Sequence, residues 1–178
     1  MGRAIGSKTH MRPRRLGAIT PLIVLLSASH LPASDRISQT MKQIIDARAA
    51  DFASIRTNPQ DAYGETDYKS SVVIPSAKEC YIRQEMKPRY ADSCDVAESK
   101  NRARIVSKYA KYAKTLRAVA PASWISWTEE RGKPGGERTY LGADRAHPAA
   151  MVGWVTEGMN ANFFLLTVTV YAEGSVKQ

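Results

Sequence analysis

The chain has 178 residues, with 26 basic and 17 acidic side chains and a formal charge of +9 at neutral pH. Five of the basic residues and none of the acidic ones lie in the first 34 positions, so residues 35–178 carry 21 basic against 17 acidic side chains. A net charge of about +4 is ordinary for solubility and does not indicate a nucleic-acid-binding protein. The roughly 140 residues after position 34 fit one domain with one hydrophobic core.

The first 34 residues have the parts of a secretory signal peptide: a basic segment, the apolar run 16–28 and then small residues. The run is shorter than the roughly 20 residues of a transmembrane helix, and no later segment is long enough, so the chain is not expected to span a membrane. Met1 or Met11 is the true start. We expect residues 1–34 to be leader and 35–178 to be one periplasmic or secreted domain. The alternative is a disordered basic arm followed by a short buried segment.

The first predicted helix covers residues 38–56, because apolar residues recur on one face at helical spacing. Its apolar residues are Met41, Ile44, Ile45, Phe52 and Ile55. The Asn58-Pro59 pair is predicted to end this helix. A polar linker at 60–67 then precedes a predicted strand at 68–74, which a proline closes.

The only two cysteines, Cys80 and Cys94, flank a predicted hairpin with its turn at residues 86–88. Pairing across this turn puts Cys80 directly opposite Cys94, and Ile82 opposite Asp92. Facing residues of an antiparallel pair approach the separation that a disulfide needs. In an oxidising compartment this predicts a structural disulfide, and the spacing is not the C-x-x-C of a thiol oxidoreductase.

A second helix is predicted from residue 99 to 120, with Ser99 as its N-cap and Pro121 ending it. Its apolar residues fall within one arc: Ile105, Val106, Tyr109, Tyr112, Ala113, Leu116, Val119 and Ala120. The opposite arc, which we call the basic face, consists of Lys100, Arg104, Lys108, Lys111 and Lys114. No acidic residue lies between positions 100 and 120.

The basic face has two interpretations. It could bind an anionic surface, such as a lipid headgroup layer, a polyanionic polysaccharide or an acidic protein. The alternative is an ordinary solvated helix face. Nucleic acid is not an expected partner, because no aromatic stacking platform is interleaved with these basic residues.

Four strands are predicted in the last third of the chain, at 124–128, 138–143, 151–157 and 162–172. Consecutive hairpins without alternating strand and helix units predict an α+β fold. We expect an antiparallel sheet of about six strands with two main helices packed on one face, in the order helix, three strands, helix, and three or four strands. This order is similar to that of small secretion-chaperone-like domains, in architecture alone. The sequence shows no internal repeat of note.

The last hairpin predicts an aromatic patch on the sheet face away from the helices. A four-residue turn pairs Trp154 with Leu165 and Thr156 with Phe163, which places Trp154, Phe163, Leu165 and Tyr171 together. We call these four residues the aromatic patch, and it would bind another exported or envelope protein. The alternative is that the sheet curls and covers this face itself, and a register slip of one residue would reverse the assignment.

The sequence gives little support for a catalytic function. Residues 35–178 contain one histidine, His147, in a loop context, and no G-x-S-x-G motif. With both cysteines bridged, ligands for a zinc site are lacking. No catalytic residue, metal or cofactor is therefore predicted, and we expect a protein-binding module, chaperone-like or inhibitor-like. Two alternatives stay open: a small secreted hydrolase with carboxylates near Asp92 or Glu157, and an envelope accessory protein that binds an anionic surface through the basic face.

Overall fold

A computed structural model describes most of the second of the two units into which the chain divides, Leu31–Gln178. The described residues are 32–62, 65–86, 89–131, 135–157 and 163–173. Most of the predicted leader lies outside them. No helix in these parts of the chain is both long and apolar enough to cross a membrane.

The described residues form two α-helices, one short 3-10 helix and eight strands. The first group is α1 (Ala33–Ala47), η1 (Arg48–Ala50), β1 (Arg56–Ala62), β2 (Glu65–Ser70), β3 (Cys80–Met86) and β4 (Arg89–Ser99). The second group is α2 (Arg102–Val119), β5 (Ile125–Arg131), β6 (Gly136–Gly142), β7 (Pro148–Glu157) and β8 (Phe163–Tyr171). Each group therefore has a helix followed by four strands, a structural repeat that the sequence does not reveal.

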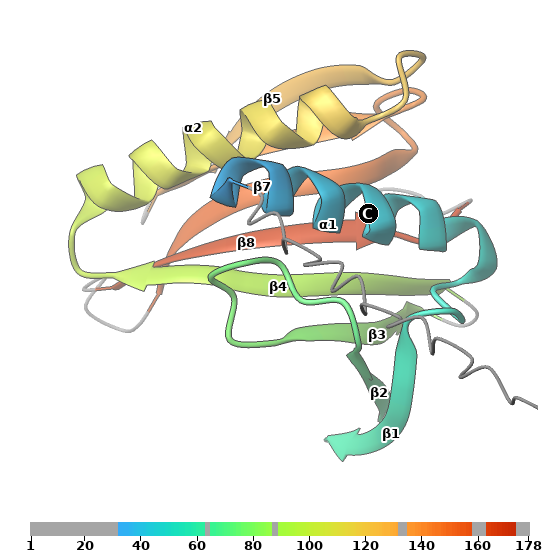
Figure 1. Ribbon diagram of the computed structural model, residues 1–178. Helices are drawn as coiled ribbons and strands as arrows, with labels where there is room; N and C mark the ends of the chain where they lie inside the picture. Colours follow the sequence, from blue (N-terminus) through green and yellow to red (C-terminus); the bar gives the residue numbers. More distant parts are fainter. Residues whose placement is uncertain (1–31, 63–64, 87–88, 132–134, 158–162, 174–178) are drawn as a thin grey trace, which may run out of the picture. The chain divides into compact units, whose positions relative to one another are not determined.

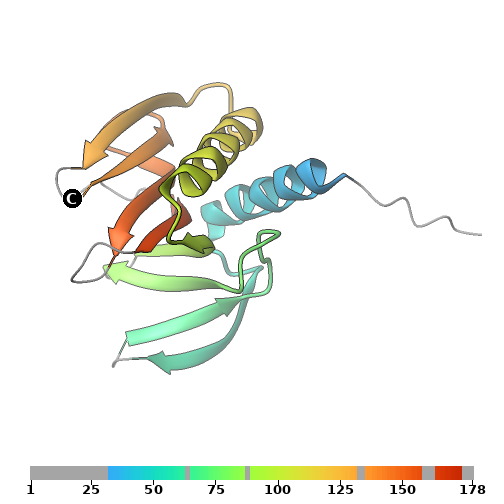
Figure 2. The same cartoon turned by 90° about the vertical axis from the view of Figure 1, so that its left-hand side faces the viewer.

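All eight strands form one antiparallel sheet in the order β1-β2-β3-β4-β8-β7-β6-β5 (Figure 1). Within each group consecutive strands pair, and the last strands of the two groups, β4 and β8, pair at the centre. Both helices lie on the same side of the sheet (Figure 2), with α2 in contact with β4, β7, β8 and α1. The predicted α+β class is confirmed, and the sheet has eight strands where about six were expected.

The strand that the sequence analysis missed is β1, which was assigned to a helix end and a polar linker. Its sequence has no apolar alternation, because it is an edge strand that pairs with β2 only. Pro59 lies within it opposite Tyr68. An edge strand tolerates proline, since the missing N–H can face away from the neighbouring strand.

The first helix, α1, covers Ala33–Ala47, whereas the predicted range was 38–56. It therefore includes the last two residues of the predicted leader and ends nine residues before the predicted end. The chain reverses where Asp51 and Phe52 adopt left-handed φ values of 49° and 61°. The Phe52 N–H then donates to the Ala47 carbonyl at 2.9 Å. This turn returns Phe52 and Ile55 to the core, where they are 0% and 4% exposed. Both residues are therefore buried, as their apolar character indicates, but outside the helix.

The hairpin of β3 and β4 has the predicted register. Cys80 pairs with Cys94, and Ile82 pairs with Asp92. Because residues two apart on a strand share a face, Asp92 lies on the same face as both cysteines. This face is the one that the helices cover, and Ile82 is fully buried there.

The N-cap of the second helix lies two residues after Ser99, the N-cap that the sequence predicted. The N-cap is Asn101, whose Oδ1 accepts from the Arg104 N–H at 3.1 Å, while Ser99 Oγ accepts from the Asn101 N–H at 3.0 Å. Five of the predicted apolar residues are buried in the core: Ile105, Tyr109, Tyr112, Ala113 and Leu116. Val106, at the edge of the predicted arc, is 36% exposed.

Candidate functional site

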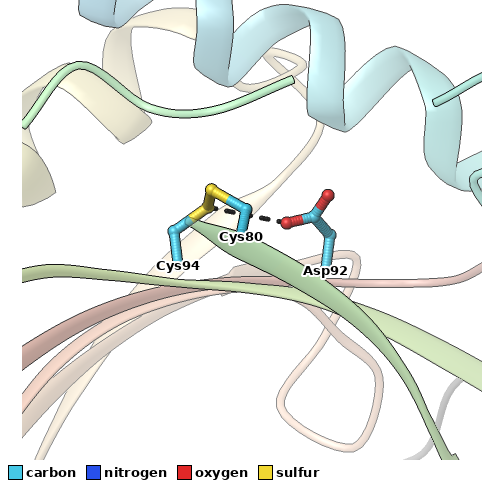
Figure 3. Close-up of side chains that lie close together, drawn as sticks. All are labelled: Cys80, Asp92 and Cys94. Carbon is cyan, nitrogen blue, oxygen red and sulfur yellow. Dashed lines mark hydrogen bonds between the residues drawn. A yellow bond between two sulfur atoms is a disulfide. The ribbon is translucent and has the colours of Figure 1, made fainter. Parts of the chain in front are cut away.

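The first candidate site is the disulfide between Cys80 and Cys94, directly across β3 and β4 (Figure 3). The two Cα atoms are 4.2 Å apart, and the cysteines are 0% and 1% exposed. Asp92 extends from β4 on the same side of the sheet, and its Oδ1 lies 3.6 Å from Cys94 Sγ. A carboxyl group is thus enclosed with the disulfide in the core.

Asp92 is 1% exposed, which makes it the most deeply buried acidic residue in the described part of the chain. Burial raises its pKa to about 7, because the ionised form is poorly solvated there, and a hydrogen bond from the Ser70 side chain opposes this effect only in part. Its Oδ2 has no hydrogen-bond partner among the described residues. Asp92 therefore holds a proton inside the core at acidic pH and releases it near neutrality.

The two sulfur atoms and an Asp92 carboxylate oxygen lie within 4.8 Å of one another, which is close enough for a shared metal ion. Metal ligation by cysteine requires the thiolate, however, and both sulfur atoms are committed to the disulfide. The cluster of Cys80, Asp92 and Cys94 is therefore a crosslink beside a buried carboxyl group, and it does not offer a metal-ligand set in this state.

The second candidate site is the basic face. Four of its residues lie on α2, and Lys100 lies two positions before the helix begins. Four of the five side chains are exposed, and Lys108 is half-buried. None of the five makes an ion pair with a carboxylate in the described part of the chain. The Lys100 ammonium lies 5.1 Å from the centre of the Phe163 ring. The structure thus places the five predicted residues together as a row of cations without acidic partners among the residues it describes.

The opposite side of α2 is held firmly to the rest of the domain. The Tyr109 hydroxyl donates to Glu137 Oε1 at 3.1 Å and lies 2.6 Å from Thr139 Oγ1. The Tyr112 hydroxyl donates to the Pro75 carbonyl at 2.9 Å. These buried and half-buried hydrogen bonds fix the rotation of α2 about its own axis, so the orientation of the basic face is set by the core.

The predicted register of the last hairpin is wrong by one residue. Trp154 pairs with Leu166 instead of Leu165, and Thr156 pairs with Phe164. Trp154 therefore lies on the helix side, 4% exposed, with the Arg102 guanidinium 5.2 Å from its ring. The four residues of the aromatic patch are consequently not on one face.

The face away from the helices is instead largely covered by its own side chains. Trp127 stacks on Tyr140 with ring centres 5.5 Å apart and planes at 16°, and both cluster with Met151, against which Tyr171 packs. Trp127, Tyr140 and Met151 are only 5–6% exposed. Of the three remaining patch residues, Phe163 is 39% exposed, and Leu165 and Tyr171 are half-buried. Trp124 lies elsewhere, packed against the helix-side core.

The residues considered for catalysis do not come together. His147 pairs through Nδ1 with Asp144 Oδ1 at 3.0 Å in an exposed loop, where hydrogen bonds from His147 lower the pKa of Asp144. Asp92 is enclosed in the core, and the side chain of Glu157 lies outside the described residues. A surface hollow of about 420 Å³ lies beside α1, and Asp92 does not line it. Its lining residues are Gln39, Lys42, Gln43, Asp46, Ser54 and Ile55.

The burial of Asp92 beside the disulfide was not predicted from the sequence, where Asp92 was proposed only as a catalytic carboxylate. The predicted pairing of the β3–β4 hairpin already implied that Asp92 is buried. Two residues apart on one strand, Asp92 and Cys94 share a face, and a buried disulfide on that face implies a buried carboxyl group. Comparison with known proteins found no matching family model, no similar curated protein and no similar solved structure.

Proposed function

We propose that this protein is exported and binds an anionic lipid surface through the basic face of α2, without catalysis. The observation that carries the proposal is the row of five basic side chains with no acidic partner among the described residues. The helix itself contains no acidic residue. The disulfide between Cys80 and Cys94 supports export, because structural disulfides persist in oxidising compartments.

The dimensions of the basic face fit a flat and extended partner. At a rise of about 1.5 Å per residue, the part of the basic face on α2, from Arg104 to Lys114, is about 15 Å long. Each basic residue near an anionic membrane contributes on the order of 1 kcal/mol, and the attraction decreases within one Debye length. Five such residues give weak and reversible binding that decreases as the salt concentration rises.

A lipid headgroup layer suits this face better than a polysaccharide or peptide chain. Four of the five residues are lysines, whose compact charges attract diffuse negative charge and do not impose the paired geometry of an arginine. A chain ligand is typically held in a groove, whereas the hollow beside α1 is lined by none of the five. A flat anionic surface therefore makes the most contacts with the row.

The protein-binding and hydrolase hypotheses receive less support. Trp154, the largest member of the aromatic patch, is in the core, which leaves Phe163, at 39% exposure, as the most exposed ring of the patch. A single exposed aromatic residue is ordinary for a soluble protein surface. Glycoside hydrolysis by carboxylates requires two of them beside the substrate. The described residues that line the hollow beside α1 include one carboxylate, Asp46.

The proposal is tested by flotation with vesicles of equal parts phosphatidylglycerol and phosphatidylcholine, compared with phosphatidylcholine alone. We expect binding to the anionic vesicles at low salt and release at high salt, where the Debye length falls to about 3 Å at 1 M. The double variant Lys108→Glu with Lys111→Glu reverses the middle of the row. It should weaken binding by more than about tenfold.

A matched control makes the same change in net charge elsewhere. Lys78 and Arg145 are exposed and lie outside α2, so Lys78→Glu with Arg145→Glu should keep most of the vesicle binding. Equal loss in both double variants would indicate a dependence on net charge alone. Retained binding in the Lys108 and Lys111 variant at low salt would overturn the proposal, and binding to a soluble polyanion but not to vesicles would replace the lipid with a polysaccharide.

A further inference from the structure

The two edge strands of the sheet, β1 and β5, differ in how they are protected against pairing with a strand of another molecule. At one edge, β1 contains Pro59, and its pairing with β2 is interrupted by a register shift between Arg56 and Pro59. Proline and bulges are devices that prevent another strand from pairing with an edge. At the other edge, β5 pairs with β6 through seven consecutive residues from Ile125 to Arg131, without a bulge or a proline. This edge is regular and lacks both devices, although the strand ends in the charged residues Glu129, Glu130 and Arg131.

The side chains of β5 are also largely uncovered. Ile125 is 48% exposed, and five of the seven residues of the strand are exposed, while only Trp127 is buried. On the helix side, Arg117 of α2 donates through Nε to Ser126 Oγ at 2.9 Å. The strand is therefore held in place from one side while its outer edge has no neighbouring strand in the described sheet.

We propose that β5 pairs antiparallel with β5 of a second copy of this chain, in a register centred on Thr128. This register pairs all seven residues of the strand. It places Ser126 opposite the partner's Glu130, Trp127 opposite the partner's Glu129, and Ile125 opposite the partner's Arg131. No like charges face each other, and the serine hydroxyl can donate to the facing carboxylate.

Neighbouring registers fit less well. Centring the pair on Glu129 sets two glutamates directly opposite each other, which is destabilising. Centring it on Trp127 or Ser126 leaves residues at the end of the strand without partners. The second copy is therefore favoured by the charge pattern of β5 itself, together with the contrast to the blocked edge at Pro59.

The pairing has a geometric consequence for the rest of the molecule. Antiparallel pairing of identical edge strands requires a two-fold axis perpendicular to the sheet. Such an axis leaves the helices of both copies on the same side of one continuous sheet. The two basic faces would then be presented on the same side, which favours bivalent contact with a flat surface. The dimer itself does not rest on the proposed lipid binding and is measured without lipid.

The test is analytical ultracentrifugation of the purified protein over a range of concentrations, with no vesicles present. We expect a concentration-dependent dimer. Thr128→Lys sets two lysines opposite each other at the two-fold axis and should weaken the dimer by about fivefold. Thr128→Asp should weaken it in the same way. A mixture of the two variants should form the heterodimer preferentially, because a lysine then faces an aspartate.

The matched control is Thr57→Lys, which adds the same charge at an exposed position of the opposite edge strand, β1. It should leave the dimer unchanged. Amide hydrogen exchange of residues 125–131 should also slow as the protein concentration rises. A protein that stays monomeric at all concentrations would overturn the proposal. So would a dimer that Thr128→Lys leaves unchanged and that mixing with Thr128→Asp does not restore.

Discussion

Asp92 Oδ1 lies 3.6 Å from Cys94 Sγ inside the core (Figure 3). A disulfide sulfur carries no hydrogen, so it can only accept a weak hydrogen bond, and only the protonated carboxyl group has a proton to donate. The contact therefore favours the neutral form of Asp92. Burial acts in the same direction, and the fold is most compatible with Asp92 when this residue is protonated.

The first prediction concerns the pH dependence of stability. The pKa of Asp92 is about 7 in the folded protein against 3.8 for an exposed aspartate, so the folded state holds an extra proton between about pH 4 and pH 7. Raising the pH through this window releases that proton and lowers the free energy of unfolding, by up to about 4 kcal/mol. Below pH 4 the contribution is fully present.

The test compares the native protein with Asp92→Asn by urea unfolding at several pH values. The amide is neutral at every pH, so we expect the variant to be comparable at pH 4 and more stable than the native protein at pH 8. Asp51→Asn is the control, because Asp51 is exposed and asparagine also adopts its left-handed backbone conformation. The raised pKa of Asp92 would be contradicted if the difference in the free energy of unfolding between the native protein and Asp92→Asn did not change with pH.

The second prediction concerns the crosslink. Cys80 and Cys94 are separated by 14 positions, and closing a loop of this length contributes about 3 kcal/mol in the chain-entropy model. The double variant Cys80→Ala with Cys94→Ala should lose about this much in the free energy of unfolding. Reductant should destabilise the native protein by a similar amount and leave the double variant unchanged. Equal stability of the two proteins would show that the disulfide is not formed.

The elements that were predicted well are those determined by residues close together in the sequence, such as a short turn. The pairing of β3 with β4 was predicted correctly from Cys80 to Gln84, because a short turn determines it, whereas Met86, assigned to the turn, pairs with Arg89 after a register shift. The first helix was predicted too long because Phe52 and Ile55 continue its apolar spacing, although the left-handed turn at Asp51 and Phe52 ends it. Strand β1 has no such pattern, and its pairing depends on β2.

The same difference between local and long-range information separates the two predicted binding surfaces, the basic face and the aromatic patch. The basic face needed only helical spacing, which determines which residues of α2 share that side, and its role in binding stays a prediction. The aromatic patch required a register between two strands, and an error of one residue moved Trp154 to the other face. Turn length, which sequence composition does not determine, decides that register.

The third prediction distinguishes the two candidate N-caps of α2. Asn101 accepts a hydrogen bond from the Arg104 N–H, whereas Ser99 accepts one from Asn101, before the helix begins. Asn101→Ala should therefore reduce the free energy of unfolding by about 1 kcal/mol, and Ser99→Ala should reduce it by less. Thermal or urea unfolding of the two variants provides the measurement. A larger effect at Ser99 would place the N-cap where the sequence predicts it.

The fourth prediction tests the register of β7 and β8. Trp154 is 4% exposed and makes an edge contact with Phe164, with ring centres 6.0 Å apart. Truncating a buried tryptophan removes its packing and leaves a cavity, so Trp154→Ala should cost about 3–5 kcal/mol in the free energy of unfolding. Leu165→Ala, on the opposite face and half-buried, should cost clearly less.

Tryptophan fluorescence gives an independent readout of the same register. If Trp154 lies under α2, the fluorescence intensity that iodide removes should be almost the same in the native protein and in Trp154→Phe, because the tryptophan that was replaced was already shielded. If Trp154 instead pairs with Leu165 and faces solvent, its replacement should remove a large share of the quenched signal, and Trp154→Ala should cost less stability than Leu165→Ala. Either outcome would return Trp154 to the outer face and restore the aromatic patch as a binding surface.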